Sequence, residues 1–90
     1  MFIVVSYDIS DDRRRAKLCR KLKSFGTWVQ YSVFECLLDT KGFERMKEAV
    51  KGIIKKGEDH VRYYPLCETC EKRIQAIGGI VTQPIRTLVV

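Results

Sequence analysis

Residues 2–15 read Phe2-Ile3-Val4-Val5-Ser6-Tyr7-Asp8-Ile9-Ser10-Asp11-Asp12-Arg13-Arg14-Arg15. The first part, up to Asp8, is rich in β-branched and aromatic residues, which predicts a strand. The Ser10-Asp11-Asp12 run is a typical helix N-cap, so the arginines that follow open a helix. The stretch therefore predicts a strand that carries the carboxylate of Asp8 to a turn, with a row of cations directly beyond it.

The chain after this stretch alternates between helix and strand patterns. The first helix is predicted to run to about Phe25 and to end at Gly26. Residues 28–38 read as strand, either one long strand or two short ones broken near Tyr31-Ser32, and the periodicity does not decide between them. A second helix starts near residues 39–42, with the apolar stripe Phe43, Met46, Val50 and Ile53.

The last part of the chain is predicted to contain a loop at 55–59, a strand at 61–66, a helical turn at 67–73 and a short final sheet strand at 74–77. The resulting order favours an α+β sandwich with two helices on one face of an antiparallel sheet. The ferredoxin-like βαββαβ arrangement is the leading topology. We expect one domain over residues 1–79, followed by a C-terminal strand at 80–90.

The composition predicts a small basic protein that gains from forming oligomers. Ninety residues make one domain, and a chain of this size buries only about 60–65% of its unfolded surface when it folds alone. The net charge of +6 and the pI near 9.3 favour a polyanionic partner, with nucleic acid first. Acidic residues follow residues 2–5 too soon for a signal peptide, and no stretch is long enough for a membrane span. The expected location is the cytoplasm.

Asp8 is the candidate catalytic residue and metal ligand. A strand-end carboxylate can hold Mg²⁺, which takes one or two protein carboxylates and completes its shell with water and phosphate oxygens. Two copies of the chain that met at this edge would supply a pair of Asp8 carboxylates. The simpler alternative is a solvated turn aspartate. The candidate nucleic-acid contacts are the nearby cations Arg13, Arg14, Arg15 and Lys17.

The cysteines and the remaining aromatic residues give weaker indications. Cys67 and Cys70 form half a zinc site, but unliganded cysteines are the favoured interpretation, ahead of a local disulfide and zinc. His60 alone is weak support for acid–base chemistry. Trp28, Tyr31 and Phe34 are interpreted as core or interface residues, with Phe34 assigned to a dimer interface.

Residues 80–90 form an apolar tail with one charge. Such an edge strand invites pairing with another chain, and Ile85, Leu88 and Val89 are its candidate dimer contacts. The alternative is a tail folded over its own sheet.

Three motifs occur in order: Val5-Ser6-Tyr7-Asp8-Ile9-Ser10-Asp11-Asp12, Val29-Gln30-Tyr31-Ser32-Val33-Phe34-Glu35, and Tyr64-Pro65-Leu66-Cys67-x-x-Cys70. With these motifs the chain resembles the second core CRISPR-associated protein family, a small ferredoxin-like family that partners the CRISPR integrase in spacer acquisition. Together the motifs span nearly the whole chain, which makes the resemblance specific. One departure stands out: many relatives have an arginine where this chain has Trp28.

The resemblance implies a symmetric homodimer whose C-terminal strands cross to the partner sheet. It also implies bridging of integrase dimers, binding of duplex DNA, and, for some members, Mg²⁺-dependent cleavage of single-stranded RNA or duplex DNA. The family's metal-ligating aspartate corresponds to Asp8, its helix arginine to Arg15, and the aromatic residue of its second motif to Phe34.

We therefore predict a Mg²⁺-dependent endonuclease of the CRISPR adaptation machinery, with the integrase as partner. The alternative is a DNA-binding structural adaptor that bridges integrase dimers without cleaving. One carboxylate per chain is little for metal-assisted hydrolysis, which keeps this alternative open.

Overall fold

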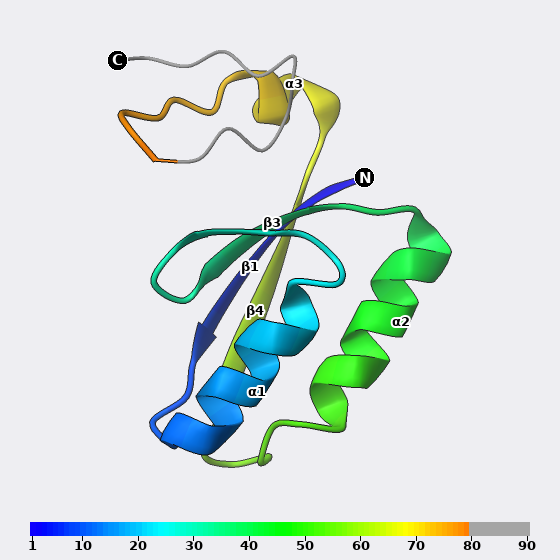
Figure 1. The fold of residues 1–90 in the computed structure, drawn as a ribbon. Helices are drawn as coiled ribbons and strands as arrows, with labels where there is room; N and C mark the ends of the chain where they lie inside the picture. The colour runs from blue at the N-terminus through cyan, green and yellow to red at the C-terminus, as the bar shows by residue number, and fades with distance from the viewer. Residues whose placement is uncertain (80–90) are drawn as a thin grey trace.

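The computed structural model describes residues 1–79, which form one four-stranded sheet with helices packed on one face (Figure 1). In chain order the elements are β1 (Phe2–Asp8), α1 (Asp12–Leu22), β2 (Thr27–Gln30), β3 (Val33–Leu37), α2 (Thr40–Lys51), β4 (His60–Leu66) and α3 (Glu68–Lys72). Among the described residues, no helix is long and apolar enough to cross a membrane.

The sheet has the strand order β2-β3-β1-β4, and every neighbouring pair is antiparallel. β1 and β2 are therefore parallel and flank β3, while β3 and β4 flank β1. Helices α1 and α2 make the two crossovers and cover the same face (Figure 1). This confirms the predicted ferredoxin-like α+β sandwich.

Residues 27–37 form two strands, which answers the question that the periodicity left open. The turn between β2 and β3 passes through Tyr31, a non-glycine residue with φ of 34°, and Ser32. The carbonyl of Ser32 accepts a hydrogen bond of 3.1 Å from the N–H of Tyr7, which fixes the turn beside β1. The pairing of β2 with β3 also shifts register between Trp28 and Gln30.

The predicted final strand at 74–77 is wrong. Because residues 27–37 supply two strands, the segment from His60 to Leu66 already provides the fourth strand of the sheet. Residues 74–77 follow α3 without regular structure and lead to Gly78 and Gly79, which both have positive φ. Figure 1 shows α3 at the end of the sheet away from the start of α1. The proposed strand at 80–90, with Ile85, Leu88 and Val89, lies outside the described residues.

Helix α1 begins where the sequence predicts and ends slightly earlier. Asp11 is the N-cap, and its carboxylate accepts a hydrogen bond of 2.9 Å from the N–H of Arg14. The last helical residue is Leu22 rather than Phe25, although the N–H groups of Phe25 and Gly26 still donate to the Leu22 carbonyl. A Cβ at Gly26 would overlap the sulfur of Cys36, so this position must stay glycine to keep the chain close to β3.

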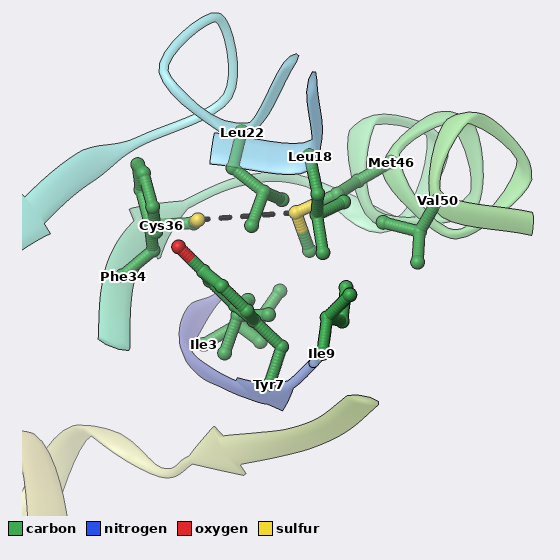
Figure 2. Close-up of a cluster of buried hydrophobic side chains, with 10 residues drawn as sticks. Ile3, Tyr7, Ile9, Leu18, Leu22, Phe34, Cys36, Met46 and Val50 are labelled. Carbon is green, nitrogen blue, oxygen red and sulfur yellow. Dashed lines mark hydrogen bonds between the residues drawn. The ribbon is translucent and has the colours of Figure 1, made fainter. Parts of the chain in front are cut away.

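The core lies between the helices and the sheet (Figure 2). Leu18 and Leu22 from α1, with Met46 and Val50 from α2, pack on the strands as the helical spacing predicts. The strands contribute alternate residues, which is the pattern of a sheet with one covered face. The buried cluster consists of Ile3, Val5, Tyr7, Ile9, Leu18, Leu22, Phe34, Cys36, Met46 and Val50.

Candidate nucleic-acid and metal site

Asp8 is the last residue of β1, and its side chain is exposed. Tyr7 is buried against the helices, so the alternation of a strand places Asp8 on the opposite face of the sheet. In the pairing of β1 with β4, Asp8 lies opposite His60, which is also exposed. The predicted metal ligand is thus accessible at one end of the uncovered sheet face.

The described residues include no group of three or more histidine, cysteine or acidic side chains that could hold a metal ion. Asp8 offers hard oxygen donors that suit Mg²⁺, but it offers only one carboxylate. The residues present fit such an ion only as part of its shell. Water, phosphate oxygens or the Asp8 carboxylate of a second copy would have to supply the rest.

Arg14, a predicted phosphate contact, is instead used inside the fold. Its Nε donates to Oδ2 of Asp59 at 2.8 Å, and its Nη2 donates to Oδ1 at 3.2 Å. The Asp59 side chain is fully buried and also accepts a 2.7 Å bond from the N–H of Lys55. The hydrogen bonds from Arg14 and then from Lys55 lower the pKa of Asp59. We therefore drop Arg14 from the predicted nucleic-acid contacts.

Arg15 holds the turn that follows Asp8 and still faces solvent. Its Nη1 donates to the carbonyl of Ile9 at 2.9 Å, and its Nη2 pairs with the carboxylate of Asp12. These contacts fix the path from the end of β1 into α1. About two fifths of the side chain stays exposed, at 41%, so the guanidinium can still meet a phosphate.

Arg13 and Lys17 are the predicted cations that the structure leaves most accessible, since both are exposed on α1. Lys17 also lines a groove between α1 and α2. The wall on the α1 side consists of Lys17, Arg20 and Lys21 from the helix and Ser24 just after it, so its charge is mainly positive. The helix surface therefore offers a strip of cations that reaches from the start of α1 towards its end.

Phe34, predicted at a dimer interface, has no exposed surface in the described chain. Figure 2 shows its ring in the core beside Cys36 and Tyr7, and its ring centroid lies 6.4 Å from that of Tyr7. Because of this burial, Phe34 can support an interface only by fixing β3.

None of the four cysteines forms a disulfide in the structure. Cys67 caps α3, and its sulfur accepts a hydrogen bond of 3.4 Å from the N–H of Cys70. This bond lowers the pKa of the Cys67 thiol, while burial raises the pKa of Cys36 to about 11.

Sequence reasoning missed two features: the role of Asp59 and the exposure of Trp28 and Tyr31. Asp59 looks like an ordinary loop acid, and only the packing of the loop against α1 shows its role. Trp28 and Tyr31 were expected in the core or an interface, and their exposures of 43% and 89% in the described chain show that they do not belong to the core. The turn signal at Tyr31-Ser32 was the available hint, because a turn carries its side chains outward.

Comparison with known proteins gives one consistent result. The family described as CRISPR associated protein Cas2 matches residues 1–74. The "CRISPR-associated endoribonuclease Cas2 3" of Chloroflexus aurantiacus is 42% identical, over 99% of this chain and 98% of that protein. The "CRISPR-associated endonuclease Cas2 2" of Thermus thermophilus is 45% identical, over 74% of each chain.

Solved structures agree with the fold. A hypothetical protein from Thermus thermophilus superposes with a TM-score of 0.80 at 37% identity, over 91% of this chain and 96% of that one. Streptococcus pyogenes Cas2 superposes with a TM-score of 0.77 at 28% identity, over 87% of this chain and all of that one. The family match over residues 1–74 includes the strand, turn and helix that carry Asp8 and the α1 cations.

Proposed function

Because the chain belongs to the family of CRISPR-associated protein Cas2, we propose that it is a metal-dependent endonuclease that takes part in CRISPR spacer acquisition. Its substrate is a phosphodiester of single-stranded RNA, duplex DNA or both. The observation that carries this proposal is the exposed Asp8 at the end of β1, with the cations of α1 directly after it. The endonuclease and endoribonuclease names of similar proteins support it.

Different residues of the chain would bind phosphate, position the turn after Asp8 and hold the metal. Arg13 and Lys17 attract and hold the phosphate backbone without reading sequence, and Arg15 keeps the turn after Asp8 in place. Asp8 would hold Mg²⁺ through its carboxylate. The ion, when bound, supplies the polarisation of a phosphoryl oxygen and lowers the pKa of water.

The proposal includes a homodimer, in which the Asp8 carboxylate of a second copy would add to the single suitable carboxylate found among the described residues. The sheet face opposite the helices supports this. Leu37 and Tyr64 are 58% and 43% exposed, and strand alternation places both on that face, where Asp8 also lies. Stacking two such faces would bury apolar surface and bring the two Asp8 residues towards one another. The strand expected at 80–90 would then pair with the partner sheet.

A second function has its own support. The described part of the chain has no three-residue metal-ligating group, and its cationic strip can bind DNA without any metal. We therefore keep the adaptor, which bridges CRISPR integrase dimers on DNA without cleaving, as the alternative. Both functions use the same surface and differ only in the chemistry at Asp8.

The deciding experiment compares the wild type with Asp8→Asn, using labelled RNA and duplex DNA in the presence of Mg²⁺ or a chelator. The variant keeps size and hydrogen bonding but loses the charge that holds a hard cation. We expect it to bind as well as the wild type and to cleave no better than the chelated wild type. Glu44→Gln, an exposed carboxylate change on α2, is the matched control and should cleave normally.

Equal cleavage by Asp8→Asn and the wild type would contradict the nuclease assignment to Asp8. Absence of cleavage from both proteins, with DNA binding retained, would select the adaptor.

A further inference from the structure

A hollow of about 350 Å³ opens beside α1, away from Asp8, and is called the aromatic hollow below. Its walls come from the start of α1, from β2 and from the β2–β3 turn. It is lined by Tyr7, Asp12, Arg15, Ala16, Cys19, Trp28, Tyr31 and Ser32. Its volume is at the small end of ligand sites in proteins, which suits a single ring system.

Two aromatic side chains at this hollow are exposed, and one of them, Trp28, is held by a hydrogen bond. Trp28 donates its indole N–H to the carbonyl of Tyr31 at 2.5 Å, which ties the edge strand to the turn. Tyr31 holds a positive φ of 34°, a conformation that costs a non-glycine residue energy. It nevertheless presents 89% of its surface to solvent. The hydrogen bond holds the Trp28 ring, and the exposed Tyr31 ring beside it offers a second face on which a ligand ring can stack.

Positive charge surrounds these rings. The Lys23 ammonium lies 5.2 Å from the centre of the Trp28 ring. On the other side Arg15 lines the hollow, and the one acidic residue of the lining, Asp12, is already paired with it. An aromatic surface bordered by cations is the arrangement that binds single-stranded nucleic acid, where rings stack on bases and cations hold phosphates.

We propose that the aromatic hollow binds one unpaired nucleobase of an RNA or DNA strand, stacked on Trp28 and Tyr31. The proposal rests on the proposed function and narrows its substrate class. A duplex keeps its bases stacked inside the helix, so only a single strand, an overhang or a frayed end can supply the base. Stacking accepts every base, so no sequence preference is expected.

The experiment uses the chain's own reporter, since Trp28 is its only tryptophan. The full chain is titrated with a uridine oligoribonucleotide and, separately, with a blunt DNA duplex, and both fluorescence and affinity are measured. We expect the single strand to quench Trp28 at saturation and the blunt duplex to bind without comparable quenching. A duplex with a single-stranded overhang should restore the quenching.

Tyr31→Ser should weaken single-strand binding about 5- to 150-fold, the usual effect of removing one stacking ring. Its affinity for the blunt duplex should not change. Ile77→Ser is the matched control, because Ile77 is a large exposed apolar residue that lies outside the aromatic hollow. Thermal unfolding of each variant confirms that the fold is intact.

Unchanged Trp28 fluorescence at saturation, or equal weakening of both ligands by Tyr31→Ser, would overturn the proposal. So would a fluorescence change that follows protein concentration without nucleic acid, because a second copy would then occupy the hollow. If these results appeared while Asp8→Asn still lost cleavage as expected, only the proposed nucleobase site would be overturned, and the proposed function would stand. A chain that bound neither nucleic acid would overturn both proposals.

Discussion

Arg14 and Arg15 are neighbours on α1, yet they belong to two regions that differ in kind. Arg14 belongs to the α1–β4 junction, defined by Arg14, Lys55 and Asp59, where every polar group named has a partner inside the chain. Arg15 borders the aromatic hollow, where Trp28 and Tyr31 remain exposed. The difference between these two arginines shows that the density of cations in a sequence does not identify a binding site. What matters is whether the fold already supplies their partners.

The largest expected effect is on stability at the α1–β4 junction. Arg14→Ala leaves the carboxylate of Asp59 buried without its cation, the most costly way to break such a pair. We expect a clear fall in the thermal midpoint. Arg13→Ala, an exposed change one position earlier, should stay within about 0.5 kcal/mol of the wild type.

Calorimetry or circular dichroism measures both midpoints. The double variant Arg14→Leu/Asp59→Leu should regain part of the loss, because it removes the unpaired charge as well. Equal midpoints for Arg14→Ala and Arg13→Ala would show that the junction does not hold α1 to the loop before β4.

The next effect is on nucleic-acid affinity. The double variant Arg13→Ala/Lys17→Ala should bind duplex DNA more weakly and reduce the slope of log K against log salt by about 1.8, since each lost phosphate contact contributes about 0.9. Arg14→Gln should leave the slope unchanged, because Arg14 is paired with Asp59. Fluorescence anisotropy over a salt series measures both. A loss of slope in Arg14→Gln equal to that of the double variant would remove the distinction between the two regions.

The fold was predictable from the sequence where local signals agreed with the packing. The strand to Asp8, the cap at Asp11 and the stripe on α2 all follow from residue type and spacing. The strand predicted at 74–77 failed because a β-rich run does not show which segment already fills the sheet. Only the split of residues 27–37 into β2 and β3 decided that.

The candidate site was predictable in part. Asp8 and the exposed cations Arg13 and Lys17 could be named from the strand-to-helix pattern. The pairing of Arg14 with Asp59 joins residues 45 positions apart, so no local pattern reveals it. The exposure of Trp28 and Tyr31 depends on β2 being a short edge strand followed by a tight turn, which the alternation alone left undecided.

A smaller effect is expected in the acid range. The pKa of Asp59 is lowered in the folded chain, chiefly by the hydrogen bonds from Arg14. The unfolded chain therefore binds more protons near the ordinary pKa of about 3.9, and stability falls with falling pH there. The contribution is complete above that pH and is lost as the pH drops through the lower, folded value.

Denaturant unfolding as a function of pH tests this. Asp59→Asn should be less stable than the wild type at neutral pH, and the difference should shrink as the pH falls below about 4. A constant difference across this range would mean that the carboxylate charge does not contribute to the α1–β4 junction.

The smallest effect is expected at the aromatic hollow. Tyr31→Gly removes the positive-φ cost but adds backbone freedom to the unfolded chain. We expect the free energy of unfolding to change by no more than about 1 kcal/mol, while single-strand binding falls. Denaturant unfolding measures the first quantity. A large loss of unfolding free energy would show that Tyr31 supports the fold as Arg14 does. The aromatic hollow and the α1–β4 junction would then not differ in this respect.

The central claim is that nucleic acid contacts the α1 and β2 side of the chain, with bases at Trp28 and Tyr31. Photo-crosslinking of the wild-type chain to a bromouridine-labelled single strand, followed by trypsin digestion and mass spectrometry, tests it most directly. We expect crosslinks in the peptide of residues 24–41, which contains both rings. Crosslinks confined to residues 63–72, which contain Tyr64 on the other face of the sheet, would contradict it.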